Sequence, residues 1–192
     1  MERCIDDEIP FKIPDSWAWC RIGDIAIKEI KRGKSPQYAD YGKAYVFAQK
    51  CNVKSGGIDM TLAKFLSDKA FDKYPTDEYM RDEDIIVNST GNGTLGRIGI
   101  FHDTDRIGTG EIVPDSHVTI LRNNKHISTM YVYYFLKYFQ PYLEKQGEGS
   151  TNQTELKPCV ISDLLFPLPP HDEQFRIVKK ISDSFTAMNA LS

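Results

Sequence analysis

One stretch divides the chain and decides how it folds; it reads Phe166-Pro167-Leu168-Pro169-Pro170-His171-Asp172-Glu173-Gln174-Phe175-Arg176-Ile177-Val178. Its three prolines keep the backbone before them extended, because a residue that precedes proline is disfavoured in the helical region. An amphipathic helix is predicted from Asp172 onward, with carboxylates in its first turn, where the free backbone N–H groups favour negative charge. The sequence therefore predicts a globular domain over residues 1–170 and a helical segment over residues 171–192.

The predicted helix carries a single apolar stripe. Val178, Ile181, Phe185 and Met188 follow one another at spacings of three, four and three residues, which is the geometry of a coiled-coil seam. A helix this short is marginal in water without a partner. We expect the stripe to form an interface with a second copy of the chain or with another protein. The alternative is that the helix folds back onto its own domain.

The globular part mixes strands and helices. Apolar runs typical of buried strands occupy residues 44–48, 84–88, 97–101, 116–122 and 160–168. A short helix is predicted near residues 68–73. A longer one is predicted over residues 129–139, where Ser128 is a suitable N-cap and Pro141 disrupts the end. These elements predict an α+β domain.

The composition is that of an ordinary globular protein. The 192 residues carry a formal net charge of −3, and 41% of them are hydrophobic. No stretch is apolar for long enough to cross a membrane, and the first eight residues lack the pattern of a secretory signal, so we expect a cytoplasmic protein. The cysteines and histidines show no spacing typical of metal ligands, and we expect no metal bound by this chain.

Charge is distributed unevenly along the chain. Residues 21–54 hold eight basic and three acidic residues, whereas residues 55–90 hold eight acidic and four basic ones. The basic segment includes a predicted loop with polar and aromatic residues beside it: Lys31, Arg32, Lys34, Gln37 and Tyr38. A loop of this kind is suited to contact the phosphates of a nucleic acid.

A glycine-rich connection joins the predicted strands at residues 84–88 and 97–101. Residues 91–96, Gly-Asn-Gly-Thr-Leu-Gly, match the GxGxxG pattern of dinucleotide-binding loops. Such a loop requires a helix after it, because the helix N-terminus holds the pyrophosphate. A strand is predicted there instead. We therefore interpret the loop as a tight connection whose backbone can approach a neighbour closely, either DNA or another part of the protein.

One alternative is a catalytic function. Asp115, Glu155 and Lys157 match the PD…(D/E)xK outline of nucleases, in which two carboxylates hold Mg²⁺ and a lysine lies near the attacking water. The gap between the two parts is long, and Pro158 follows the lysine directly, which disfavours the match. The alternative function is thus a Mg²⁺-dependent DNA endonuclease using these three residues. A plain protein-interaction module is a third hypothesis.

Several stretches together resemble the target recognition domain of type I restriction–modification specificity subunits. The resemblance runs in order over nearly the whole chain, and residues 166–178 are its most specific part. The other matching stretches are residues 13–17, 21–25, 32–36, 82–91, 96–99, 116–118 and 149–153. The resemblance implies a twisted, largely antiparallel sheet with flanking helices, followed by a spacer helix.

The resemblance also implies a function. Each such domain reads one half of a bipartite double-stranded DNA target, and a full specificity subunit joins two of them through helices. The subunit is not an enzyme itself. It recruits modification (methyltransferase) subunits and restriction subunits, which use S-adenosylmethionine, ATP and Mg²⁺, while this chain would bind none of these cofactors. The sequence leaves open which form of the subunit this chain represents. It could be a fragment, a half-length subunit that pairs with itself, or one domain of a longer protein.

The DNA contacts are predicted on three loops. Lysines and arginines would neutralise phosphates, while amide and hydroxyl groups would approach the bases. The predicted contact residues are Lys31, Arg32, Lys34, Gln37, Tyr38, Ser89, Thr90, Asn92, Thr94, Arg97, Ser150, Thr151, Asn152 and Gln153. The predicted subunit interface is the helical stripe of Val178, Ile181, Phe185 and Met188.

Overall fold

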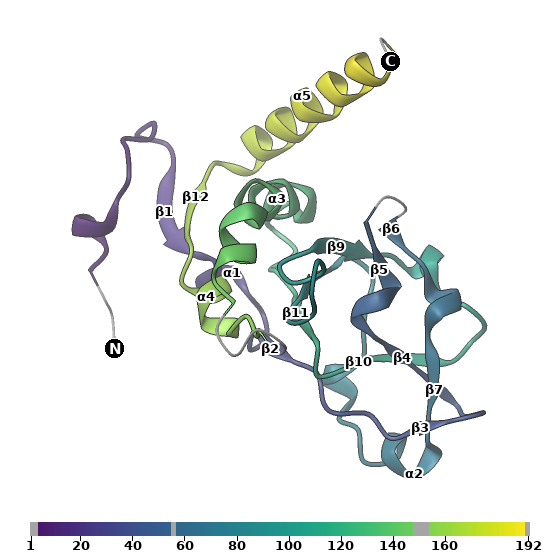
Figure 1. The fold of residues 1–192 in the computed structure, drawn as a ribbon. Helices are drawn as coiled ribbons and strands as arrows, with labels where there is room; N and C mark the ends of the chain where they lie inside the picture. Colours follow the sequence, from purple (N-terminus) through teal and green to yellow (C-terminus); the bar gives the residue numbers. More distant parts are fainter. Residues whose placement is uncertain (1–3, 55–56, 148–153, 191–192) are drawn as a thin grey trace.

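A computed structural model of the protein describes residues 4–54, 57–147 and 154–190 (Figure 1). The strands are β1 (Ala18–Arg21), β2 (Lys31–Arg32), β3 (Tyr38–Ala39), β4 (Ala44–Phe47), β5 (Asn52–Val53), β6 (Gly57–Ile58), β7 (Lys64–Leu66), β8 (Asp84–Asn88), β9 (Ile98–Phe101), β10 (Glu111–Pro114), β11 (Val118–Leu121) and β12 (Leu165–Leu168). The helices are α1 (Ile22–Ile25), α2 (Asp68–Phe71), α3 (Thr129–Lys145), α4 (Pro158–Ser162) and α5 (His171–Asn189).

Most strands pair in the antiparallel sense. The order β2-β11-β8-β9 forms a four-stranded sheet in which every pair is antiparallel. A second sheet, in the order β10-β4-β7-β3, contains one parallel pair, β4 with β10. Strand β1 pairs with β12, and β5 pairs with β6. The α+β class and its largely antiparallel pairing are confirmed, although the strands are divided among separate sheets.

The sheet β2-β11-β8-β9 lies between two hydrophobic cores. Ile85 and Val87 of β8 pack on one side, in a core that α1, α3 and α4 help to build. Ile86 packs on the other side, together with Phe47 and Ile112 of the second sheet. Successive residues of a strand point to opposite faces, so β8 is buried along its whole length. Figure 1 shows the helices α1, α3 and α4 on one side of this sheet and β4, β7 and β10 on the other.

Helix α3 begins where it is predicted and ends later. The Ser128 Oγ accepts a hydrogen bond from the backbone N–H of Tyr131, which confirms the predicted cap. The expectation that Pro141 disrupts the helix end is wrong, because α3 continues through it to Lys145. A proline inside a helix costs about 3 kcal/mol. Leu143, beyond the proline, is fully buried, and burying such a side chain contributes about 1.5–3 kcal/mol in return.

The apolar run at residues 160–168 is not one strand, and this prediction is wrong. It contains the end of α4, a turn and then β12. Pro158 stands at the first position of α4, where a missing N–H costs nothing and the fixed φ suits the helix. The proline that argued against the nuclease outline was therefore a helix signal.

Gln174 joins the proline-rich strand end to both long helices. Its side chain is almost fully buried, with 2% of the residue exposed. The Gln174 Oε1 accepts a hydrogen bond from the backbone N–H of Ser128 at 2.8 Å, and its Nε2 donates to the carbonyl of Pro169 at 2.9 Å. The Tyr131 hydroxyl donates to the carbonyl of Pro167 at 2.9 Å. These contacts hold the starts of α3 and α5 together.

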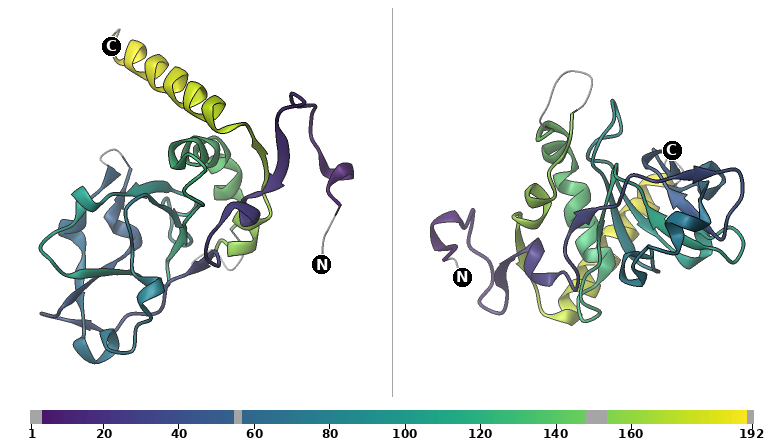
Figure 2. Two further views of the ribbon diagram at one scale, coloured as in Figure 1. Left: turned by 180° about the vertical axis from the view of Figure 1, so that it is seen from behind. Right: turned by 90° about the horizontal axis from the view of Figure 1, so that it is seen from below.

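Helix α5 starts against the domain and then leaves it. Ile177 and Val178 pack against the core that contains α3. Further along, the ring of Phe185 still stacks on Tyr134 of α3, with the ring centroids 6.3 Å apart. The end of α5 projects away from the rest of the fold (Figures 1 and 2). The predicted C-terminal helix is thus confirmed, while its role as a separate spacer stays a prediction. Among the described residues, no helix has the length and apolar character that crossing a membrane requires.

The Gln174→Leu substitution tests the junction. It removes one donor and one acceptor, and it leaves the half-buried Ser128 N–H and the carbonyl of buried Pro169 without these partners, at a cost of about 1–3 kcal/mol for a fully buried group and less for a half-buried one. We expect the free energy of unfolding to fall by about 2–4 kcal/mol in urea denaturation. Arg176→Leu, at a side chain that is 75% exposed, is the control and should change it by less than about 0.5 kcal/mol. Equal effects of both substitutions would contradict the role of Gln174.

Candidate nucleic-acid interface

The glycine-rich loop between β8 and β9 is compact and closed by its own backbone. The N–H groups of Thr94 and Leu95 both donate to the carbonyl of Gly91. The N–H of Gly96 donates to the carbonyl of Asn88 at 2.8 Å. The strand β9 follows directly, so the loop lacks the helix that a dinucleotide site needs. Figure 2 shows the loop on the same side of the molecule as the C-terminal end of α3.

A buried network of polar side chains supports this loop from below. Asn52 Nδ2 donates to Asn88 Oδ1 at 3.2 Å, and Asn88 Nδ2 donates to the carbonyl of Gln49 at 3.0 Å. Thr90 Oγ1 donates to Gln49 Oε1 at 3.0 Å and lies 2.7 Å from His117 Nδ1. Buried polar groups that are satisfied in this way specify one arrangement, because any other would leave some of them unpaired. The network therefore holds the loop in a defined shape.

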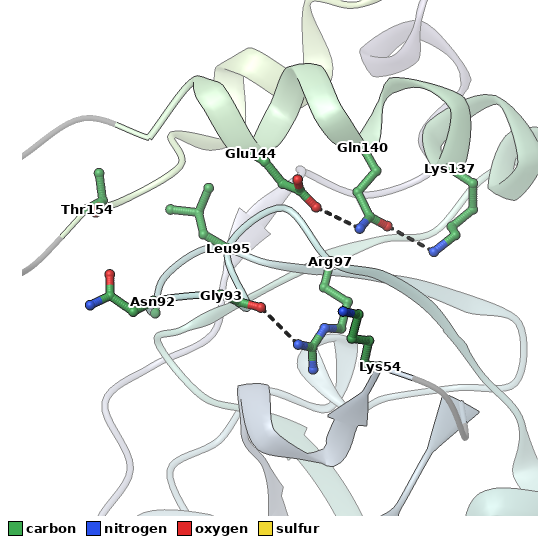
Figure 3. Close-up of a pocket in the computed structure, with 10 residues that line it drawn as sticks. Lys54, Asn92, Gly93, Leu95, Arg97, Lys137, Gln140, Glu144 and Thr154 are labelled. Atoms are coloured by element: carbon green, nitrogen blue, oxygen red, sulfur yellow. Dashed lines mark hydrogen bonds between the residues drawn. The ribbon is translucent and has the colours of Figure 1, made fainter.

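Arg97 closes the loop and faces a cleft. Its guanidinium donates to the carbonyl of Asn52 at 2.7 Å and to the carbonyl of Gly93 at 3.0 Å, so its position is fixed by backbone on both sides. Lys54 and Lys137 line the same cleft, which has a volume of about 530 Å³ (Figure 3). Three cations from separate segments of the chain thus meet beside the glycine loop.

The opposite wall of the cleft is the C-terminal half of α3. Lys137 Nζ donates to Gln140 Oε1 at 2.9 Å, and Gln140 Nε2 donates to Glu144 Oε1 at 2.8 Å (Figure 3). Burial lowers the pKa of Lys137; the nearby charge of Arg97 acts in the same direction, and Glu144 opposes it. Among the described residues that line the cleft, one carboxylate faces three cations. The cleft therefore favours a bound anion, and an anion there would also stabilise the charged form of Lys137.

The predicted basic loop is in part strand, because Lys31 and Arg32 form β2 and Tyr38 begins β3, and its cations are partly neutralised by acids. Lys31 Nζ lies 3.2 Å and Lys34 Nζ lies 3.4 Å from the same Glu78 carboxylate, which is itself buried. The hydrogen bond to Glu78 raises the pKa of Lys31. Arg32 pairs with Glu155 at 2.9 Å. These cations are therefore less available to phosphates than the sequence indicates, while Gln37 and Tyr38 are exposed.

The remaining predicted contact residues divide into two groups. Ser89 is fully buried and hydrogen-bonded to Thr119 Oγ1 at 2.6 Å, and Thr90 is nearly buried in the polar network. These two hydroxyls support the loop and do not face a ligand, which corrects the prediction for them. Asn92 is exposed and Thr94 is half-buried at the loop surface. Ser150, Thr151, Asn152 and Gln153 lie outside the described residues.

Sequence reasoning missed Lys54, Lys137 and Gln140. Lys54 lies at the end of the basic segment and was counted there only as a charge. Lys137 and Gln140 lie on α3, a helix with many aromatic residues, and such a helix is interpreted mainly as part of the hydrophobic core. Their spacing of three residues places them on one helix face, and this was the available signal.

The nuclease outline is not assembled into a metal site. Asp115 is buried, and its Oδ1 accepts the backbone N–H of His117 at 2.8 Å. Glu155 pairs with Arg32 instead. Within residues 4–54, 57–147 and 154–190, no group of three or more His, Cys, Asp or Glu side chains is placed to hold a metal ion.

The sequence pattern of the family described as "Type I restriction modification DNA specificity domain" matches residues 14–192. The chain belongs to this family. The resemblance seen in the sequence is thereby confirmed, and the match of this specificity domain includes the glycine loop, the cleft and helix α5.

Two curated relatives of this chain are specificity subunits of type I restriction enzymes. One relative is the specificity subunit of the type I restriction enzyme MjaVIII from Methanocaldococcus jannaschii. It is 27% identical over 194 residues, and the match covers 90% of this chain and 36% of that protein. The EcoEI specificity subunit of Escherichia coli is 26% identical over 194 residues, covering 97% of this chain and 32% of that one. The specificity domain thus spans about a third of the length of these relatives.

Solved structures show the same fold. A chain from a structure on complex assembly and conformational transition of the type I R-M system superposes with a TM-score of 0.71 and 21% identity, covering 95% of this specificity domain and 41% of that chain. The HsdS subunit from Thermoanaerobacter tengcongensis gives a TM-score of 0.69 and 20% identity, covering 95% and 40%. At these identities the likeness shows the fold alone.

Two glycine substitutions in the specificity domain test how the loop packs. Gly93 and Gly96 have φ values of 72° and 77°, which cost a residue with a Cβ about 1–2 kcal/mol. A Cβ at Gly93 would meet open space, whereas one at Gly96 would lie 2.9 Å from the backbone N of Glu144. We expect Gly96→Ala to lower the free energy of unfolding by about 1–3 kcal/mol more than Gly93→Ala does, measured with urea. Equal losses would mean that the loop is not packed against α3.

Proposed function

We propose that the chain reads one half of a bipartite double-stranded DNA target, as a specificity subunit or half-subunit of a type I restriction–modification system. Its membership of the specificity-domain family supports this function. The observation that carries it in the structure is the cleft beside the glycine loop, where Lys54, Arg97 and Lys137 meet. A cleft with this charge suits the DNA backbone.

The cleft and the exposed loops divide the task of recognition. Cations that neutralise phosphates set the position and orientation of a protein on DNA, whereas sequence is read at base edges. Lys54, Arg97 and Lys137 supply the first kind of contact. Gln37 and Asn92 are exposed on loops, Tyr38 is exposed at the start of β3, and all three are suited to the second kind.

The chemistry is proposed to belong to other subunits. The chain would recruit modification (methyltransferase) subunits that use S-adenosylmethionine and restriction subunits that use ATP and Mg²⁺, and would itself be non-catalytic. Asp115 and Glu155, the carboxylates of the nuclease outline, are engaged with His117 and Arg32. The endonuclease is therefore not the function that the geometry favours.

Helix α5 is proposed to pair with another helix. Its apolar stripe has two halves: Val178 packs on the domain and Ile181 is half-buried, whereas 53% of Phe185 and 64% of Met188 are exposed. The first half of the stripe packs on its own domain, as the fold-back alternative predicts. The second half leaves apolar surface exposed. That half can pack against a second copy, the other half of a longer subunit or the modification subunit.

The DNA-binding proposal is tested through salt dependence. Each phosphate contact contributes about 0.9 to the slope of log K against log salt. We expect Lys54→Gln and Lys137→Gln each to weaken binding to duplex DNA of any sequence and to lower the slope by about one, measured by fluorescence anisotropy. Lys12→Gln, an exposed lysine in the segment before β1 that does not line the cleft, is the control and should leave the slope unchanged. Salt-independent binding, or no binding, would contradict the proposal.

The pairing of α5 is tested with Phe185→Asp combined with Met188→Asp. Two carboxylates in the exposed half of the stripe should abolish self-association in sedimentation, because charges cannot be buried in an apolar seam. The circular dichroism of the domain should be unchanged. Thr186→Asp combined with Ala187→Asp adds the same charge on the opposite face and should leave association intact. A wild-type chain that is strictly monomeric and does not bind a modification subunit through α5 would contradict the proposal.

A further inference from the structure

A second recess lies next to Thr90, at the start of the glycine loop, because Gln49 and His117 line this recess and both contact the Thr90 hydroxyl. It has a volume of about 250 Å³. The polar and aromatic residues that line it are Tyr38, Gln49, Lys50, Lys64, Asp115 and His117. It forms where the parallel strands β4 and β10 end together, because Gln49 follows β4 and Asp115 follows β10. Because the two parallel strands end side by side, Gln49 and Asp115 both line the same recess.

Asp115 supplies a buried acceptor to this recess. Only 2% of the residue is exposed, and burial raises the pKa of its carboxyl group. The Oδ1 atom accepts the His117 backbone N–H at 2.8 Å. Among the residues that the structure describes, none donates a hydrogen bond to Oδ2, and this oxygen is not one of the fully buried polar atoms that lack a partner. The Oδ2 atom therefore keeps an open acceptor position in the recess, which suits a ligand that brings an N–H group.

Gln49 and His117 are held in place around this acceptor. Gln49 Oε1 accepts a hydrogen bond from Thr90, and His117 Nδ1 lies 2.7 Å from the same Thr90 hydroxyl. The Gln49 amide also lies close to Gly91, where a Cβ would approach its Oε1 to 2.8 Å. Fixed donors and acceptors of this kind can distinguish one base edge from another, because little reorganisation is needed when the base arrives.

The rim of the recess is basic, while its floor is acidic. Lys50 is exposed, and Lys64 lies over the exposed ring of Tyr38 at 5.2 Å from the centroid. The lysines at the rim suit DNA phosphates, but the Asp115 carboxylate on the floor repels phosphates. An acid in such a place favours an uncharged group with an N–H donor. In the major groove those donors are the amino groups of cytosine and adenine.

We propose that this recess is a base-reading subsite in which Asp115 accepts a hydrogen bond from the exocyclic amino group of cytosine or adenine. The inference rests on the proposed DNA-recognition function and adds the residue that determines preference at one position of the half-site. Gln49 and His117 orient the base edge, and Lys50 and Lys64 hold the adjacent backbone.

The Asp115→Asn substitution tests the assignment. The amide keeps the Oδ1 acceptor for His117 but presents an N–H donor in place of Oδ2. Wild-type and variant chains are used to select duplexes from a randomised library, and both selections are sequenced. We expect preference for cytosine or adenine at one position to fall on the order of 5- to 100-fold, with other positions unchanged. Asp7→Asn, the same change at an exposed acid that does not line the recess, should leave the selected sequence unchanged.

A second measurement uses the wild-type chain and needs no folded variant. Each cytosine and adenine of the selected sequence is replaced in turn by an analogue that lacks the exocyclic amino group. One replacement should weaken wild-type binding by a similar factor, and the same replacement should have no effect on Asp115→Asn if that variant folds.

The outcomes separate this inference from the function on which it rests. A wild-type chain that selects no sequence and binds no DNA would overturn both. Selection of the same sequence by wild type and Asp115→Asn, or uniform weakening of the variant on all sequences, would overturn the assignment of Asp115 and leave DNA recognition standing. Insensitivity of the wild type to every amino deletion would overturn it as well.

Discussion

The buried amide of Gln174 is the contact on which the arrangement of the two long helices depends. A buried amide must satisfy both its donor and its acceptor, and here the two partners belong to the N-cap of α3 and to the proline-rich strand end before α5. Fixing the start of α3 also fixes its far end, where Lys137, Gln140 and Glu144 form one wall of the cleft. A contact remote from the proposed DNA site therefore positions half of that site.

The other half of the site depends on polar burial beneath the glycine loop. Asn52, Asn88 and Thr90 are nearly inaccessible to solvent and satisfy one another through Gln49 and His117. A loop held by such a network keeps its exposed groups within a narrow range of positions. Readout of base edges needs this property, because hydrogen bonds weaken steeply once their geometry is lost.

Local charge, and not net charge, makes the fold suitable for a polyanion. The chain carries −3 in total, yet Lys54, Arg97 and Lys137 face a cleft whose described lining residues include one carboxylate. The most basic segment of the sequence contributes less than its composition suggests, because Glu78 pairs with Lys31 and Lys34 and Glu155 pairs with Arg32. An acid from a distant segment can neutralise a basic segment, and only the folded chain shows which cations are paired.

The sequence by itself determined the α+β class, strand β8, the cap at Ser128, the start of α5 and the family, because these depend on local periodicity, capping chemistry and motif order. It misplaced the end of α3 at Pro141 and merged α4 with β12, since burial of Leu143 and the first-turn position of Pro158 act through packing and context. The cleft and the Asp115 recess were decided by tertiary structure alone. Their residues come from segments far apart in the chain, and no local sequence pattern predicts which side chains come into contact when strands and helices pack.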